Sequence, residues 1–453
     1  MSHLLKKKNK TIYKLFALSI FSIIFFLFYF GIQKYNGNKI NYLLFSIISN
    51  FLIFFAIRKN AIFFETFFSL LLWLGFWFKF SCTIVLTDGV FREGVGTFNY
   101  SNKSFDDTLI VSQIGILSFI LSGFFRQYFL FNYPKKLEFQ NFKINFFSFG
   151  RKNVWFIFIV SFIAIAFCNF YFKIYQKGLL PIYEINFLIS GIFKWLLLFG
   201  LSAISATLIF YEYNFYKKFF LISALIIFVE TFFTSFSMIS RGMIFNAFAL
   251  MYGIYKYSKI VNKPNSFNYY IKSIIFIFIL FYISVSSVNY IRANYFYVGK
   301  SVEFVKEKSQ VESKDQKKKK YASSKEINSE ILYLIVNRWV GIDGVMSVIS
   351  KKDLLSLPFL TSSFNERATK NTPTFYELTF GLEENKISSQ LYENVKGNTL
   401  PGLIAFLFYS GSYSVLFLSI FFLSIFASYL EFMSFKLSFG NLIIVLSINS
   451  KSH

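Results

Sequence analysis

Residues 313–326 read SKDQKKKKYASSKE. They lie inside a polar segment, Arg292 to Asn398, which interrupts a chain of 453 residues that is 55% hydrophobic and contains 68 Phe residues. The apolar runs on both sides of this segment reach the length of about 20 residues that a helix needs to cross a bilayer. Inside lipid, each segment must satisfy its own backbone hydrogen bonds, so these runs predict helices. The predicted fold class is therefore all-α, a polytopic transmembrane helical bundle.

The predicted spans divide the chain into three parts. Residues 1–291 form an N-terminal membrane bundle, 292–398 form one large loop, and 399–453 form a C-terminal membrane segment. The last part contains a span at 400–430 and a run at 437–448 that is short for a span, so we expect about ten or eleven spans in total. The nine spans of the N-terminal bundle are predicted at 11–32, 39–57, 61–86, 108–133, 153–172, 187–211, 219–238, 243–257 and 273–290.

The basic charge of the chain is interpreted as a topology signal. The formal net charge is +24, and many lysines and arginines stand in clusters beside the apolar runs. Lys and Arg residues in short loops are retained on the cytoplasmic side during insertion. Most of the Lys and Arg residues in short loops lie on the cytoplasmic side when the N-terminus and the 134–152 loop are placed in the cytoplasm. The loop 292–398 is then extracytoplasmic, and no nucleic-acid partner is expected.

Neither a metal nor another cofactor is expected from the residues that could hold one. Cys82 and Cys168 lie in apolar segments without the spacing of metal ligands, and the histidines are His3 and His453. A proton acceptor in the folded body must therefore be a carboxylate. Glu377 is one candidate within the large loop.

One piece of the large loop is apolar. Residues 331–349 read ILYLIVNRWVGIDGVMSVI, and Asn337, Arg338 and Asp343 interrupt the run. We expect a helix that lies in the interface or re-enters the membrane, with its charges facing water. The alternative is an ordinary span. Arg338 and Asp343 make this segment a candidate site for a charged substrate, against the alternative of scattered charges on an exposed helix.

Ser240-Arg241-Gly242 predicts a tight reversal between two spans. Arg241 could anchor the helix end by extending to the interface. It could also bind an anion, because a guanidinium binds phosphate oxygens bidentately and the next helix would add its N-terminal N–H groups. Arg292 and Arg367 have the same two interpretations, with interfacial anchoring favoured.

Four further charges stand within or near the predicted spans: Glu65, Lys79, Lys194 and Glu230. Ionisable residues inside a membrane are functional candidates. Glu230 and Lys194 could instead form a structural pair, because their spans are neighbours in sequence.

Three stretches carry a resemblance to a known family. They are Ser240-Arg241-Gly242 opening a span, Asn337-Arg338-Trp339…Gly341…Asp343 within a large outer loop, and Leu400-Pro401-Gly402…Tyr409…Gly411 before an apolar helix. In these stretches and in its layout, the chain resembles the bacterial O-antigen and capsular polysaccharide repeat-unit polymerases (the Wzy type). These are membrane glycosyltransferases that use lipid-linked donors.

The resemblance implies a metal-independent enzyme of the bacterial cytoplasmic membrane that joins oligosaccharide repeat units at the outer face. The donor is a glycan on polyprenyl diphosphate, and a flippase and chain-length regulator proteins are implied partners besides the lipid bilayer. Arg241 and Arg338 would bind the diphosphate, with Arg292 and Arg367 as further substrate-binding residues, and Asp343 or Glu377 would be the catalytic base. A lipid-linked oligosaccharide flippase and a glycan ligase that uses the same donor stay open as alternatives.

Overall fold

The computed structural model describes residues 21–91, 95–132, 145–177, 186–215, 220–240, 339–366, 374–380 and 401–437, with Leu18, Val336 and short stretches between 246 and 291. The regular elements among these residues are helices, with no strand among them, which confirms the all-α prediction. Six helical segments are long and apolar enough to cross a membrane: Lys39–Ile57, Phe63–Thr87, Asn102–Leu130, Gly150–Phe172, Leu188–Ile209 and Tyr413–Ser434. The chain is therefore a polytopic membrane protein.

Two shorter apolar helices, Phe21–Lys34 and Ile222–Ser237, coincide with the first and seventh predicted spans. The predicted spans at 243–257 and 273–290 and the run at 437–448 lie largely or wholly outside the described residues. A total of ten or eleven spans stays a prediction.

Contacts within the chain divide it into two compact units. Unit 1 comprises Met1–Phe131, Lys317–Ile387 and Asn398–Ala427, and unit 2 comprises Asn132–Gln316, Ser388–Gly397 and Ser428–His453. The predicted parts at 1–291, 292–398 and 399–453 follow the chain order, whereas each unit combines separate parts of the chain.

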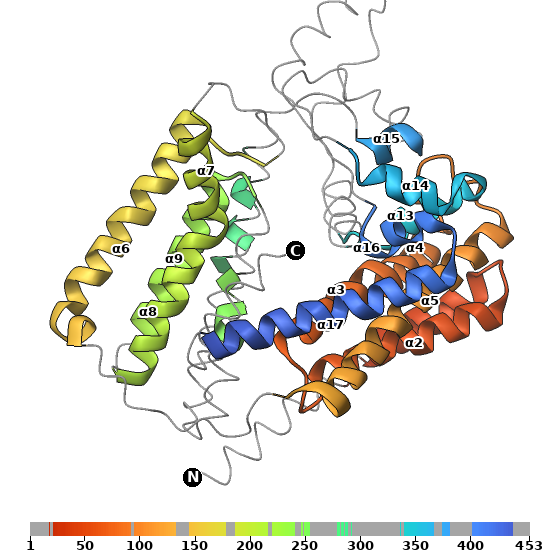
Figure 1. The fold of residues 1–453 in the computed structure, drawn as a ribbon, viewed down its shortest axis with the longest axis horizontal. Coiled ribbons are helices and arrows are strands. Elements are labelled where there is room, and N and C mark those ends of the chain that lie inside the picture. Colours follow the sequence, from red (N-terminus) through yellow and green to blue (C-terminus); the bar gives the residue numbers. More distant parts are fainter. Residues whose placement is uncertain are drawn as a thin grey trace, which may run out of the picture. The chain divides into compact units, whose positions relative to one another are not determined.

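Unit 1 is built on a helix group from the first third of the chain. In it α2 (Lys39–Ile57) packs against both α3 (Phe63–Leu72) and α5 (Asn102–Phe125), as Figure 1 shows. The segment that starts with α3 continues through the π-helix η1 (Trp73–Phe78) into α4 (Lys79–Thr87), and α5 continues into the π-helix η2 (Arg126–Leu130). The largest fully buried side chains of this group are mainly aromatic and include Tyr42, Phe45, Phe55, Trp77, Phe80 and Phe119.

Hydrogen bonds join these helices inside the apolar core. The Trp77 indole donates to Ser46 Oγ at 2.9 Å, and the Tyr42 and Ser81 hydroxyls are 3.0 Å apart. Lipid is as apolar as a leucine side chain, so packing and polar contacts associate helices in a membrane more than the hydrophobic effect does. These pairs therefore fix how α2 faces the η1–α4 segment.

The rest of unit 1 comes from the last third of the chain as a set of short helices and one long helix. They are α13 (Ile342–Ile349), the 3-10 turn η6 (Lys352–Leu354), α14 (Leu357–Ser363), α15 (Phe375–Thr379), α16 (Leu403–Leu407), the 3-10 turn η8 (Phe408–Ser410) and α17 (Tyr413–Leu437), whose first part, up to Ala427, belongs to unit 1. α13 packs against α5 and α16.

The predicted span at 400–430 was too long at its start. Gly411 has a left-handed backbone with φ of 67°, which ends η8 and separates α16 from α17. Residues with a side chain rarely adopt this conformation, so a glycine favours a break at this point. The membrane-spanning helix begins at Tyr413.

The segment 331–349 also differs from its prediction. The described helix is α13, only eight residues long, and every residue in it except Asp343 is buried. Eight residues rise about 12 Å, so α13 is too short to be an ordinary span. Asp343 does not face water as expected, because it contacts a buried amine.

Unit 2 holds α6 (Asn145–Phe172), α7 (Phe187–Trp195), the π-helix η3 (Leu196–Gly200), α8 (Leu201–Phe215) and α9 (Phe220–Ser237). α9 packs against α6 and α8 (Figure 1). Arg151 donates to Glu212 Oε1 at 2.6 Å, and the Trp155 indole donates to the same oxygen at 2.8 Å, so a buried carboxylate joins α6 to α8. Glu230 accepts from the Thr234 hydroxyl at 2.8 Å, and the Lys194 amine lies 5.7 Å from the Tyr175 ring centre.

Candidate functional site

The candidate site is a buried ion pair in unit 1 between Lys79 and Asp343. The Lys79 side chain is 4% exposed and the Asp343 side chain 13%. The Lys79 amine donates to Asp343 Oδ2 and, at 3.1 Å, to the Trp339 carbonyl oxygen. The two residues are 264 positions apart in sequence. The pair therefore joins the third predicted span to the large loop.

The π-helix η1 places Lys79. It contributes one wider turn directly before Lys79, whose backbone N–H donates to the Leu74 carbonyl. Such turns are rare and are frequent at functional sites. The same turn contacts the chain before α13, since a Cβ on Gly75 would lie 2.4 Å from the Val340 carbonyl oxygen. Only glycine allows the two backbones to approach this closely.

α13 places Asp343 in its first turn. A carboxylate is stabilised there by the helix dipole and by the free N–H groups of the helix start. An adjacent ammonium group favours the charged form of the acid as well.

The loop 95–101 covers one face of α13. Asp343, Ser347 and Ser350 share this face, because residues four and seven positions apart align on a helix. A Cβ on Gly96 would lie 3.1 Å from Ser347 Oγ, and the hydroxyls of Thr97 and Ser350 are 3.1 Å apart. The loop therefore lies along the C-terminal half of α13, beside Ser347 and Ser350.

Tyr100 stands where this loop is open to solvent, and it is 40% exposed. Burial raises the pKa of the Tyr100 phenol, and the negative charge of Asp343 raises it further. Tyr100 thus lies within electrostatic reach of the ion pair.

Tyr376 of α15 lies near the site, within reach of Ser347 and Asp343. Burial raises the pKa of its phenol, the Ser347 hydroxyl opposes this shift, and the charges of Asp343 and Glu377 add to it. The phenol therefore stays neutral at physiological pH. Tyr409 of η8 lies close to Tyr376. Burial raises the pKa of the Tyr409 phenol, and the Tyr376 phenol raises it further.

Of the residues predicted from the sequence, Asp343 is in the site, and the charges of both Asp343 and Glu377 act on the Tyr376 phenol. Glu377 has a structural role, because its carboxylate accepts from the Thr374 backbone N–H at 3.0 Å while Thr374 Oγ1 accepts from the Glu377 N–H at 3.2 Å. This capping box starts α15. Arg241, Arg338, Arg292 and Arg367 lie outside the described residues.

Sequence reasoning identified Lys79 as an intramembrane charge but missed its partner. The spacing Thr374-Phe375-Tyr376-Glu377 is a capping-box signature, and it could have assigned Glu377 to a helix start. No short-range signal connects Lys79 to Asp343. The sequence alone could indicate that Asp343 pairs with one of the intramembrane cations, but it could not indicate which one.

A second buried ion cluster in unit 1 surrounds Glu65. Arg126 donates to both Glu65 oxygens at 2.8 and 2.9 Å and to the carbonyls of Phe131 and Asn60, and it is fully buried. Arg58 donates to Glu65 Oε2 at 2.7 Å. Burial lowers the pKa of Arg58 to about 10, although the Glu65 charge opposes the shift. The cluster joins the end of α2, the start of α3 and η2.

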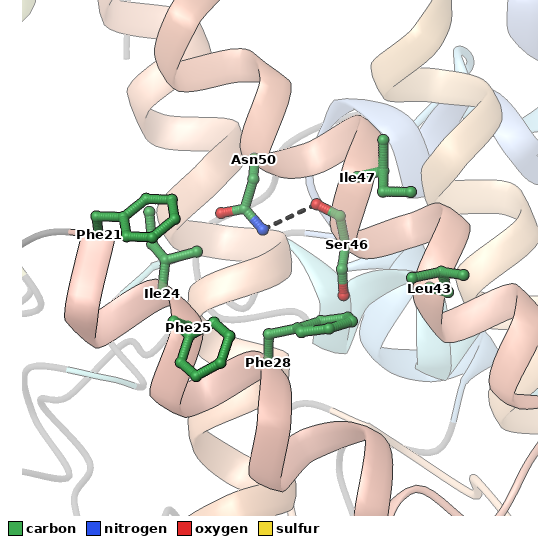
Figure 2. A pocket seen from close by; sticks show the side chains of 8 residues that line it. All are labelled: Phe21, Ile24, Phe25, Phe28, Leu43, Ser46, Ile47 and Asn50. Atoms are coloured by element: carbon green, nitrogen blue, oxygen red, sulfur yellow. Dashed lines mark hydrogen bonds between the residues drawn. The ribbon is translucent and has the colours of Figure 1, made fainter.

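The membrane-spanning helix α2 also borders a groove of about 290 Å³ (Figure 2). Its polar residues are Ser46 and Asn50, which accept from the indoles of Trp77 and Trp73, and Asn50 donates to the Ser46 carbonyl. The other lining residues are Phe21, Ile24, Phe25, Phe28, Leu43 and Ile47. The groove offers hydrocarbon contact and no titratable group, so it is not the chemical site.

No protein-family model matches the chain, and neither does any of the curated proteins or the solved structures.

Proposed function

We propose that the chain polymerises lipid-linked oligosaccharide repeat units of the O-antigen or capsule type. In this proposal it lies in the bacterial cytoplasmic membrane with its N-terminus in the cytoplasm, and it acts at the outer face. The substrate is an oligosaccharide on polyprenyl diphosphate, and a flippase and chain-length regulator proteins work beside it. The observation that supports this function is the Lys79–Asp343 pair, a carboxylate held within a membrane bundle next to a polar loop.

The proposed reaction is metal-independent glycosyl transfer. A hydroxyl oxygen of the acceptor sugar attacks the anomeric carbon of the donor, and the bond from that carbon to the diphosphate oxygen breaks. Asp343 takes the proton of the attacking hydroxyl, and polyprenyl diphosphate leaves with the electron pair of the broken bond. General-base catalysis of this kind contributes roughly 10²- to 10⁴-fold in rate.

The proposal gives Lys79 a positioning role. Its ammonium group binds Asp343 Oδ2 and so orients the carboxylate, which is the proposed proton acceptor. Because Asp343 neutralises Lys79, the cations for the leaving diphosphate must come from elsewhere. Arg241 and Arg338 are the residues that the family resemblance offers for this role, with Arg292 and Arg367 as further candidates.

The test uses the purified full chain in detergent and lipid-linked repeat units extracted from cells in which its gene is deleted. We expect longer lipid-linked glycans and release of polyprenyl diphosphate, and we expect neither from Asp343→Asn. A flippase would leave chain length unchanged in detergent, where no bilayer exists. A ligase would form product only with a different acceptor lipid. Either of these outcomes contradicts the proposed polymerisation.

A further inference from the structure

The turn 173–177, which follows α6 in unit 2, is bonded to the end of α9. The Asn169 side-chain amide donates to the Ser237 carbonyl at 3.0 Å. The Lys177 backbone N–H donates to the Met238 carbonyl at 2.9 Å. The two helix ends therefore form one polar cluster, which the reaction proposed above does not use.

Both helix ends carry backbone strain. Lys173 opens the turn with φ of 50°, and Ile239 follows α9 with φ of 51°. Glycine or asparagine usually takes this left-handed conformation at a helix end, and a β-branched residue such as isoleucine rarely does. Ile239 is fully buried, so the surrounding structure holds it in this conformation. Strained backbone of this kind is concentrated at functional sites.

Gln176 of this turn is a buried amide that is left unused. Its exposed fraction is 5%, and neither Nε2 nor Oε1 has a hydrogen-bond partner among the described residues. On α9, one helical turn before Met238, Ser235 is fully buried, and its Oγ has no partner in the described part of the chain either. Buried polar groups in native proteins are nearly always paired, so each exception needs an explanation. A ligand that bonds Gln176 supplies one.

The chemistry of an amide defines the ligand. Nε2 donates hydrogen bonds and Oε1 accepts them, so the ligand must offer an acceptor and a donor together. A diphosphate oxygen only accepts, and hydrocarbon does neither. Two neighbouring hydroxyls of a sugar do both, because one can donate to Oε1 while the other accepts from Nε2.

The place of the turn in the membrane also favours a sugar. The span Gly150–Phe172 ends directly before it. In the proposed orientation the 134–152 loop is cytoplasmic, so the turn 173–177 lies at the outer face, where the oligosaccharide is. Lys177 is exposed, so the turn borders the protein surface.

We propose that Gln176 binds a pair of hydroxyls of the oligosaccharide, with the Ser235 hydroxyl as a second contact. This inference rests on the proposed polymerisation and adds to it a sugar-binding site in unit 2. Gln176 takes no part in bond formation, so its loss weakens substrate binding and leaves the rate of the bound complex unchanged.

The test measures the unfolding temperature of the purified full chain in detergent, with and without the oligosaccharide released from extracted lipid-linked repeats by mild acid. The KM for the intact lipid-linked repeat is measured in parallel. Gln176→Met keeps the length of the side chain and removes its polar atoms, and Ser235→Ala removes one hydroxyl. Ser49→Ala is the matched control, because Ser49 of α2 in unit 1 is also fully buried, with no partner for its Oγ among the described residues.

We expect the oligosaccharide to raise the unfolding temperature of the wild-type chain and of Ser49→Ala by at least about 2 °C, because a ligand stabilises the state that binds it. Gln176→Met should show no such rise. Without ligand it should unfold at an equal or higher temperature, since it no longer buries an unpartnered amide. Its KM should increase roughly tenfold, with kcat changed by less than about twofold, and Ser235→Ala should increase KM about threefold.

A lower unfolding temperature of Gln176→Met with an unchanged KM would show that the amide only holds an internal water, and it would overturn the inference. If Gln176→Met does not fold, Ser235→Ala decides, and a wild-type KM and ligand response in that variant would overturn the inference too. A chain that binds the oligosaccharide through Gln176 but does not polymerise would keep this site and overturn the proposed function.

Discussion

Two buried ion pairs lie on the same membrane-spanning segment, Phe63–Thr87, and they differ in how deeply their carboxylates are buried. Glu65 receives two arginines, and Arg126 also satisfies two backbone carbonyls, with both Glu65 and Arg126 fully buried. Fourteen residues later, about 21 Å along a helix, Lys79 pairs with Asp343, whose side chain is 13% exposed. Saturated, inaccessible charges join helices. We propose that Asp343, the less buried of the two carboxylates, is the one that reacts.

The largest effect is expected from removing the charge of Asp343. Asp343→Asn retains an oxygen that accepts from Lys79 but cannot take a proton, so we predict at least a 100-fold loss of polymerisation. Cells should accumulate single lipid-linked repeats on the outer face, measurable by extraction and chain-length analysis. If the variant reaches the normal amount in the membrane and glycan chain length is unchanged, the Lys79–Asp343 pair has a structural role, as the Glu65 cluster does.

Glu65→Leu should act on folding. It leaves Arg126 buried without its carboxylate, and breaking a buried pair costs about 3–5 kcal/mol. We predict a sharply lower thermal unfolding temperature in detergent, and residual protein with a normal specific activity. If the Glu65→Leu protein is stable but inactive, the Glu65 cluster serves activity and not folding, which contradicts the comparison between the two pairs.

Gly341→Ala tests how closely the backbone must approach the π-helix. The added Cβ would lie 2.4 Å from the Gly75 carbonyl oxygen, so η1 and Lys79 would have to shift. Overpacking of this kind costs about 1–3 kcal/mol. Activity should fall with stability, in contrast to Asp343→Asn, and a variant with wild-type stability and rate would contradict the tight contact.

Glu377→Ala should have the smallest effect. It removes the capping box of α15, and the loss of such a cap costs about 1 kcal/mol. We predict a small fall in unfolding temperature and near-normal polymer length. A loss of polymer as large as that of Asp343→Asn would make Glu377 the catalytic base after all.

The sequence was sufficient for the fold class because lipid enforces it. Apolar runs such as 39–57 must be helices, and the predicted bounds of this span agree with α2. Where backbone conformation decided the outcome, the prediction failed. The start of α17 depends on the left-handed Gly411, and a run of apolar letters does not show this break.

Half of the candidate pair could be predicted. Asp343 was identified because an ionisable residue in an apolar segment is a candidate functional residue. Its partner could not be assigned, because Lys79 and Lys194 are equivalent intramembrane cations until packing selects between them. The close contact of Gly75 with Val340 makes that selection, and it arises only in the folded chain.

The most direct measurement replaces the whole Lys79–Asp343 pair by apolar residues. Lys79→Met combined with Asp343→Leu leaves no buried charge unpaired, and such replacements are often neutral or stabilising. If the pair exists for function, this double variant should reach wild-type membrane levels with an equal or higher unfolding temperature and should make no polymer. A double variant that makes polymer of normal length would contradict a catalytic role for the pair.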